Sequence, residues 1–441
     1  MSNKGRDTFA VKALFVGTVA VVALAIIVAV WSSSFNTSPK VKVPTPKMPS
    51  PNAYDNYTAA AYMLNQEQDI KNAYDALIRA PGSGQQVYPV PANKILVADN
   101  ASALMELRRG FNHDYWNPPL RSFSTLLPQY SKFRALARLL ALEGRTKADK
   151  GDWKGAMDSY LDAMRMGRDI PRGGSLLAIC LGISIQRIGR REACRAADHL
   201  TGDEAKEAAK RMEDITARRI AFADMLREEK WYMQSSLVEM FQRPRWREEF
   251  SPAHSGGGLQ VKMKRLHSNL LGLTYNKSRI MSSYTDYMDS AIAASNTPYA
   301  RFSEPPRPKD NIADIMACFC KNYLFVAVKT ETQNALLTVT LALRAYHSDH
   351  GRYPNSLSEL APVYIKKIPN DQFALNSPLR YKRVGGKYTL YSVGPDGKDN
   401  GGKAINDPKG NAILRGLPKA ERRYSVQMKS KGDIVAGVNN N

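Results

Sequence analysis

Two of the places in this sequence where a histidine lies beside a carboxylate hold the residues most suited to acid–base or metal chemistry. Asp198 precedes His199, and the segment His347-Ser348-Asp349-His350 ends an expected helix. His347 and His350 stand three residues apart, so that both imidazoles could bind one metal ion. We favour the alternative, a polar helix end at which the imidazoles interact with the negative end of the helix dipole.

Motifs of the common enzyme classes are missing from the sequence. It contains no G-x-S-x-G turn, no P-loop, no H-E-x-x-H motif and no dinucleotide-binding glycine pattern. The adjacent Glu228 and Glu229 project from different faces of an expected helix, and we expect both to be solvated. We therefore predict a protein without enzymatic activity. The alternative is a hydrolase with a site in the helical domain, near His199, Glu192 or Asp198.

The cysteines are too few for a disulfide scaffold, since there are only Cys180, Cys194, Cys318 and Cys320. Cys318-Phe319-Cys320 is expected to lie on a helix, where a rotation of ~100° per residue directs the two thiols about 200° apart. This geometry suits neither a local disulfide nor a two-ligand metal site. We expect buried apolar thiols.

The composition is that of a globular chain with an unusual positive charge. The 441 residues suffice for two or three domains, and 43% of them are hydrophobic and 24% charged. The formal net charge of +22 favours anionic partners. However, the basic residues are spread from Lys4 to Lys431 without a nucleic-acid-binding motif. We expect a solvated basic surface and no nucleic-acid partner; a surface that binds an anionic polymer is the alternative.

The amino-terminal residues predict a membrane anchor. Residues 13–31 are 19 uncharged residues, close to the ~20 that a membrane-spanning helix needs and longer than the usual core of a cleaved signal peptide. We predict a cytoplasmic stub and a single transmembrane helix in residues 1–31, with the body outside the inner (cytoplasmic) membrane. A proline-rich linker over residues 32–56 is expected to be an extended spacer that holds the body off the membrane.

Residues 57–302 are expected to form an irregular α-helical domain. Apolar periodicity predicts helices over residues 57–79, 100–111, 133–144, 175–200 and 204–240. Small residues at Gly144, Ala156 and Ala163 would let two antiparallel helices approach, with Tyr160 in the groove between them. Together with a turn at residues 150–152, this pattern predicts one helical hairpin of the tetratricopeptide type. Because no second copy is present, we expect a local hairpin and not a solenoid.

An α+β module is expected over residues 303–415, followed by a basic polar tail over residues 416–441. A helix over residues 330–350 should end at Gly351, and Ser356 with Glu359 forms a capping-box pattern. Two alternating runs, 379–384 and 387–393, are joined by Gly385-Gly386, which predicts a β-hairpin. The predicted fold class is therefore mainly α, with a small sheet near the carboxyl end.

This module resembles the carboxy-terminal domain of the major pseudopilin of bacterial type II secretion systems. The resemblance covers about residues 330–410. It rests on the D-x-G-R-Y-P segment 349–354, on Pro369 and Asp371, on the segment 377–381 and on the S-V-G-P-D-G segment 392–397. The arrangement as a whole also resembles bacterial membrane-anchored proteins of undefined role.

The resemblance implies a calcium ion in the loop after the last strand. Asp396 and Asp407 match the two acidic positions of the family's loop. Asp399, Asn400 and Asn406 add further oxygen donors of the kind that Ca²⁺ prefers, whereas Lys403 places a positive charge inside the loop.

The amino terminus departs from the pseudopilin pattern. In a pseudopilin, the cleavage-site glycine is followed by phenylalanine and by a glutamate at the fifth mature position, but Arg6 follows Gly5 here and Ala10 lies five residues on. We expect no processing and no polymerisation. The predicted function is non-enzymatic: a membrane-anchored extracytoplasmic protein that binds envelope proteins in assembly or beside a secretion apparatus.

Overall fold

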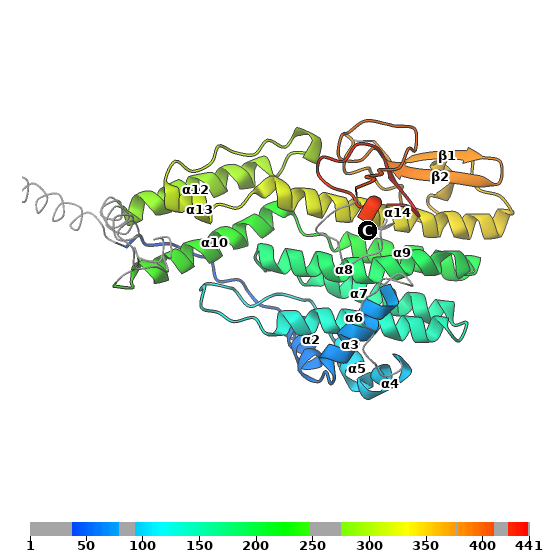
Figure 1. Cartoon of the computed structure of the whole chain (residues 1–441), viewed down its shortest axis with the longest axis horizontal. Helices are drawn as coiled ribbons and strands as arrows, with labels where there is room; N and C mark the ends of the chain where they lie inside the picture. The colour runs from blue at the N-terminus through cyan, green and yellow to red at the C-terminus, as the bar shows by residue number, and fades with distance from the viewer. Residues whose placement is uncertain are drawn as a thin grey trace, which may run out of the picture.

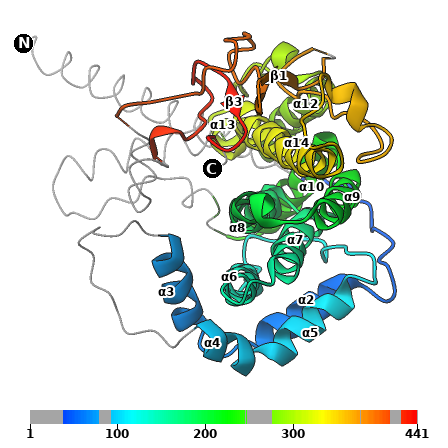
Figure 2. The same cartoon turned by 90° about the vertical axis from the view of Figure 1, so that its right-hand side faces the viewer.

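A computed structural model describes residues 38–78, 93–244, 246, 275–375, 377–409 and 422–439. The expected membrane anchor, residues 13–31, lies outside these residues. Helices make up 58% and strands 5% of the structure, which confirms the mainly helical class with a small sheet. The helices are stacked in layers, and the sheet covers the last layer (Figures 1 and 2).

The first layer consists of four short helices that pack on a longer one. They are α2 (Ala53–Tyr62), α3 (Glu67–Ile78), α4 (Asn93–Asp99) and α5 (Ala101–Gly110), and they cover α6 (Gln129–Ala148). The prediction of one helix over residues 57–79 was wrong, because the chain turns at residues 63–66. Gln66 there has a positive φ of 57°, and the backbone N–H of Asn65 donates to Asn100 Oδ1 at 2.8 Å. Helix α5 starts directly after Asn100, as predicted. However, the Asn100 side chain does not cap α5 but accepts the hydrogen bond from the turn at residues 63–66.

The predicted helical hairpin is formed by α6 and α7 (Trp153–Asp169). The turn contains Gly151 at φ 80°, and the Asp152 carboxylate accepts the N–H of Gly155 at 2.7 Å to cap α7. Helix α8 (Leu176–Ala196) packs against α7 at two glycines. A Cβ on Gly167 would lie 2.6 Å from the carbonyl oxygen of Gly182, so the two backbones are in direct contact.

Helix α9 (Gly202–Ala217) begins at the Thr201–Glu204 capping box and packs on α7 and on the long helix α14. The prediction of one helix over residues 204–240 was wrong. The chain leaves the helix at residues 218–221 and starts α10 (Phe222–Phe241), which packs instead against α12 (Lys277–Ala294). Helices α9 and α10 pack against different helices, and this accounts for the break between them. The apolar periodicity of the sequence does not mark it.

The longest helix, α14 (Cys320–His350), lies in the core beneath the sheet (Figure 1). It ends at Gly351 with φ 64°, as predicted, but begins ten residues before the predicted position 330. A short helix, α13 (Asn311–Met316), precedes it. Among the described residues, only the stretch Asn311–His350 is long and apolar enough to cross a membrane, and much of α14 is buried against α8 and α9.

The sheet is a three-stranded antiparallel sheet in the order β1-β2-β3. Strands β1 (Arg380–Val384) and β2 (Lys387–Ser392) form the predicted hairpin, with Val384 opposite Lys387. Strand β3 (Ile434–Val435) comes from the residues expected to be a polar tail. That expectation was wrong for residues 422–439, because Ile434, Asp433 and Asn439 are buried.

Two of the predicted domain boundaries do not match the way in which the chain packs. Residues 38–52 do not stand free as a spacer: Val41 packs against the ends of α10 and α12, and α2 begins at Ala53 and not after residue 56. One core cluster also runs from α7 through α14 to β3, so the module begun at residue 303 shares its core with the helices before it.

Candidate functional site

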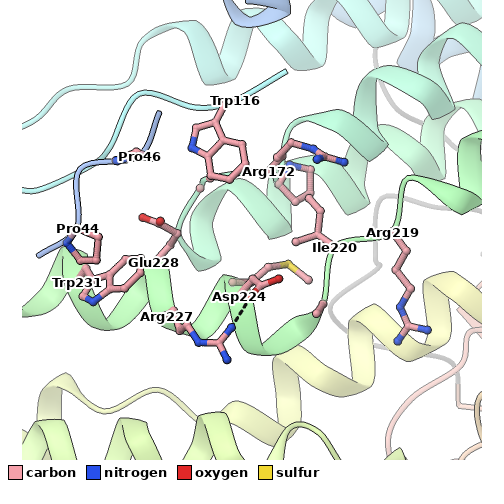
Figure 3. A pocket seen from close by; sticks show the side chains of 15 residues that line it. Pro44, Pro46, Trp116, Arg172, Arg219, Ile220, Asp224, Arg227, Glu228 and Trp231 are labelled. Carbon is pink, nitrogen blue, oxygen red and sulfur yellow. Dashed lines mark hydrogen bonds and ion pairs between the residues drawn. The ribbon is translucent and has the colours of Figure 1, made fainter. Parts of the chain in front are cut away.

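A hollow lined by aromatic and charged side chains lies where α10, the turn before α8 and the proline-rich segment meet (Figure 3). It has a volume of about 360 Å³. Its walls come from four separate parts of the chain: Pro44, Pro46, Trp116, Pro171, Arg172, Gly173, Gly174, Arg219, Ile220, Ala221, Asp224, Met225, Arg227, Glu228 and Trp231. We call this hollow the tryptophan pocket.

Local hydrogen bonds fix the Trp116 wall. The Asn52 side chain donates to the carbonyl oxygen of Trp116 at 2.9 Å and accepts its N–H at 3.0 Å. The backbone N–H of the next residue, Asn117, donates to the carbonyl oxygen of Arg172 at 3.0 Å. Gly173 has a φ of 69°, and a Cβ there would lie 2.2 Å from Trp116 Nε1, so only glycine leaves room for the indole.

The indole Nε1 of Trp116 is buried and has no hydrogen-bond partner among the described residues. Trp231 stands on α10 across the pocket, with Pro44 beside it (Figure 3). The guanidinium of Arg121 lies 6.0 Å from the centre of the Trp231 ring, a cation–π contact that stabilises its position. Two indoles and two prolines therefore give the pocket rigid apolar walls of the kind used to bind apolar and aromatic groups.

Charged groups surround these walls, and arginine is in excess. Arg172, Arg219 and Arg227 line the pocket, against Asp224 and Glu228. Arg227 is paired with Asp224 on the same helix. Burial raises the pKa of Glu228, an effect that the neighbouring Arg121 opposes at 3.2 Å. The rim therefore favours a ligand that carries negative charge.

The indole, proline and arginine side chains of the pocket suit it to binding a ligand. Its described lining contains no serine, cysteine, histidine or lysine. The carboxylates present are held by arginines and have no histidine beside them. None of the residues singled out for chemistry in the sequence lies in it except Glu228.

The prediction that Glu228 and Glu229 are solvated was wrong. Both are buried, at 9% and 6% exposure. Glu229 accepts the backbone N–H of Leu176 at 2.9 Å and so caps the first turn of α8, and burial raises its pKa. Adjacent residues on a helix that is covered on two sides can both be buried, which the sequence alone did not reveal.

The structure does not bring the predicted calcium ligands together. The Asp396 carboxylate accepts the N–H groups of Lys398 and Gly432, at 3.1 and 3.3 Å. The Asp399 carboxylate accepts the Tyr391 hydroxyl and the Gly401 N–H. Within the described residues, no three His, Cys, Asp or Glu side chains are grouped as metal ligands.

The remaining predicted ligands are engaged elsewhere in the loop. Asp407 accepts the N–H of Lys409 at 3.0 Å. Asn406 accepts from the Arg423 guanidinium at 2.5 Å, and the Asn400 amide donates to the carbonyl oxygen of Lys398 at 2.8 Å. These donors make hydrogen bonds within the loop. The calcium ion stays a prediction from the resemblance.

A carboxylate from outside the predicted loop holds it closed. Asp433, just before β3, is completely buried and accepts the N–H of Asn400 at 3.1 Å and that of Gly402 at 2.7 Å. Burial raises the pKa of Asp433, whereas these two bonds lower it. The only sequence signal for this residue is an aspartate between glycine and a short β-branched run, which is too weak to identify it.

Among the described residues, His199, His347 and His350 lie against aromatic rings. The His199 ring lies 3.8 Å from the Trp153 ring and nearly parallel to it, and Asp198 is exposed beside it. Glu192 is buried and bonded to Arg195 at 3.2 Å. These residues do not form the site that a hydrolase in this domain would need.

His347 and His350 likewise do not face one ligand position. His350 stacks on Tyr346 at 4.1 Å, and its Nδ1 lies 3.0 Å from the Tyr346 carbonyl oxygen. His347 packs against the Tyr353 ring at 4.5 Å. The polar helix end that we favoured agrees with this geometry.

The prediction for Cys318 and Cys320 was wrong in its geometry. Cys318 precedes α14 and does not lie on it, and the two sulfurs are 3.2 Å apart instead of facing opposite ways. Cys320 is buried, as expected, and Cys318 is half-buried. The sequence gives no proline or glycine at positions 316–319 to mark the helix break.

Comparisons of the chain with protein-family models, curated proteins and solved structures find no match. The pseudopilin resemblance of residues 330–410 therefore stays a prediction.

Proposed function

We propose that this protein is a membrane-anchored, extracytoplasmic binding protein of the bacterial envelope, without enzymatic activity. The tryptophan pocket is the observation that carries this proposal. Its partner is an extended segment of another envelope protein that places an apolar or aromatic side chain between acidic residues. The indoles Trp116 and Trp231 bind the apolar side chain, and the arginine rim binds the neighbouring carboxylates.

The proline-rich segment supports a link between anchor and pocket. Pro44 and Pro46 form part of the pocket wall, and the segment continues toward the uncharged stretch at residues 13–31. Binding therefore takes place close to the point where the chain leaves the membrane. The pseudopilin-like module, with the pattern of residues 349–354 and 392–397, supports a role beside a secretion or pilus apparatus.

The binding test uses the detergent-solubilised full chain and a synthetic acidic peptide with one central phenylalanine, followed by tryptophan fluorescence. A second peptide replaces the phenylalanine by serine, and a third replaces the acids by lysine. We expect binding of the first peptide alone. Trp231→Ala and Arg172→Glu should each weaken it by about tenfold or more, as expected for a buried aromatic anchor and a charged rim.

Arg145→Glu is the matched control, because this arginine is exposed on α6 far along the chain from the pocket and is paired only with Asp149. Its binding should be unchanged. An equal loss in Arg145→Glu and Arg172→Glu would show general attraction to a basic surface. Absence of binding by the first peptide at low salt would reject the pocket as the docking site.

The proposed location has its own test. Cells that produce the full chain and cells that produce a variant without residues 13–31 are separated into membrane and soluble fractions. Protease is then added to spheroplasts. We expect the full chain in the membrane fraction and accessible to protease, and the variant to be released; a protected full chain would contradict the proposed orientation.

A further inference from the structure

The junction between α13 and α14 places two thiols side by side. The backbone leaves the helical conformation at Ala317, with φ −74° and ψ 125°, and at Phe319, with φ −84° and ψ 88°. The second pair of angles is close to an inverse γ-turn, which folds the chain back at its central residue. As a result, Cys318 Sγ and Cys320 Sγ lie 3.2 Å apart, and both cysteines are free thiols.

Arg307 holds the first side of this junction. Its guanidinium donates to the carbonyl oxygen of Ala317 at 2.8 Å and to that of Cys318 at 3.3 Å, and it pairs with Asp314 at 2.6 Å. The same group lies 4.4 Å from the centre of the Phe319 ring. The turn that brings the sulfurs together is therefore fixed by four contacts of one side chain.

Glu304 holds the second side. Its carboxylate accepts the N–H of Cys320 at 2.8 Å and that of Lys321 at 2.6 Å, and so caps the start of α14. The Tyr287 hydroxyl lies 2.7 Å from the same carboxylate and 3.7 Å from Cys320 Sγ. Both ends of the Cys-Phe-Cys turn are thus positioned by residues outside it.

The two sulfurs have different environments. Cys320 is completely buried, whereas Cys318 is half-buried. The hydrogen bond from the Cys318 thiol lowers the pKa of the Cys320 thiol, and the Tyr287 hydroxyl lowers it further, against the opposing effects of burial and Glu304. In contrast, burial raises the pKa of Cys180, and raises that of Cys194 to about 11.

We propose that Cys318 and Cys320 form a reversible dithiol–disulfide site, which is oxidised by thiol–disulfide exchange with an external disulfide. Cys318, the accessible sulfur, reacts with that disulfide, and Cys320 closes the ring. An extracytoplasmic location would expose the pair to oxidising conditions in which such bonds persist. The proposal rests on the geometry of the pair and does not depend on the tryptophan pocket.

The exchange takes place in two steps. Cys320 first releases its own proton to solvent, and the resulting thiolate accepts the proton of Cys318; the Cys318 sulfur then attacks one sulfur of the external disulfide, and the other sulfur leaves as a thiolate. After Cys320 loses its proton, its thiolate attacks Cys318 Sγ, and the second external sulfur leaves. The two cysteine protons neutralise the two departing thiolates. The protein pair loses two electrons, and the external disulfide gains them.

The test uses the full chain at pH 7 in buffers of increasing ratio of oxidised to reduced glutathione. Free thiols are blocked with N-ethylmaleimide in denaturant, and the chain is digested with trypsin. Cleavage after Lys309 and Lys321 gives one peptide, residues 310–321, that contains both cysteines and neither Cys180 nor Cys194. We expect this peptide to lose both maleimide groups and two hydrogens as the ratio rises, and to regain them with dithiothreitol.

Two variants separate the roles of the sulfurs. Cys320→Ser should accumulate one glutathione on Cys318, because no thiol remains to displace it. Cys318→Ser should react several-fold more slowly, because the remaining sulfur is buried. Cys180→Ser with Cys194→Ser is the matched control and should leave the oxidation of the pair unchanged.

Two results would overturn the proposal. The first is a wild-type peptide that carries two maleimide groups at every glutathione ratio. The second is a stable glutathione adduct on wild-type Cys318 without ring closure. If a serine variant fails to fold, Tyr287→Phe supplies a second measurement: it should shift the pH profile of iodoacetamide labelling of the pair to higher pH, and an unchanged profile would count against the proposed thiolate at Cys320.

Discussion

The ring of Tyr160 occupies the space that a side chain on Gly144 would need: a Cβ there would lie 2.2 Å from Tyr160 Cε1. Gly144 is buried on α6, and Tyr160 is buried on α7, so that this contact sets how closely the two helices pack. The contact is the centre of the hairpin that the spacing of small residues predicted.

The first prediction concerns this contact. Gly144→Ala should lower the free energy of unfolding by about 1–3 kcal/mol, because overpacking forces the ring or the helix to move. In a chain that already carries Tyr160→Ala, Gly144→Ala should lower the free energy of unfolding much less. Urea unfolding of the wild type, the two single variants and the double variant measures the coupling between Gly144 and Tyr160. Gly386→Ala is the control, since a Cβ there meets nothing within 4 Å. An equal cost in both backgrounds would contradict the contact.

The second prediction concerns a buried ion pair between α7 and α14. The Arg168 guanidinium pairs with the Glu331 carboxylate and donates to the carbonyl oxygen of Thr216 at 2.7 Å. Glu331→Ala should destabilise the protein by about 3 kcal/mol, because it leaves a buried charge unpaired. Replacing both residues by methionine should cost less than Glu331→Ala alone.

The exposed pair of Arg145 and Asp149 is the control for that experiment. Asp149→Ala should change the free energy of unfolding by less than about 0.5 kcal/mol, since surface pairs contribute little. Similar losses at the two sites would show that the pair between α7 and α14 is hydrated in solution.

The third prediction is a pH dependence at Lys329. Burial lowers the pKa of this lysine to about 8, and Arg187 and Arg190 act in the same direction. Because the unfolded chain keeps its proton up to pH ~10.4, this group costs stability below pH 8 and the cost is relieved as the pH rises above 8. Lys329→Met should therefore stabilise the protein by about 1–3 kcal/mol at pH 7.

That advantage should shrink between pH 8 and pH 9.5, as measured by urea unfolding at each pH. Lys366→Met, at an exposed lysine, should show no such change. A stabilisation by Lys329→Met that is constant over this range would mean that the lysine is solvated and that only apolar burial was gained.

The fourth prediction concerns the loop that Asp433 closes. Asp433→Asn should lower the free energy of unfolding by about 1–3 kcal/mol, because one of the two backbone N–H groups that bond to the buried Asp433 carboxylate loses its acceptor. Asp99→Asn, at an exposed position, is the control. Millimolar calcium tests the ion that the resemblance predicts: it should raise the melting temperature of the wild-type chain, and an unchanged melting temperature would contradict the ion.

A calcium-dependent rise in melting temperature that is lost in Asp396→Ala would establish the metal site that the resemblance implies. If calcium restored the stability that Asp433→Asn loses, the same conclusion would follow. Either result would mean that the loop rearranges around the ion.

The sequence determined those features that local chemistry fixes. Gly351 is the residue that can take φ 64° after a helix, and Ser356 with Glu359 completes a capping box within four residues. Gly385-Gly386 joins two alternating runs in the only register that a two-residue turn permits. In each case the partners are close in the chain, so that their types and spacing are sufficient.

Only the tertiary structure decided the features that join distant residues. Asp433 accepts from the backbone of Asn400 and Gly402, and Pro44 lies beside Trp231 on the pocket wall. The sulfurs of Cys318 and Cys320 are neighbours in sequence, but their approach depends on Arg307 and Glu304, which break the helix from outside it. Packing of this kind leaves no period or spacing in the sequence, because each contact is set by the arrangement of whole helices.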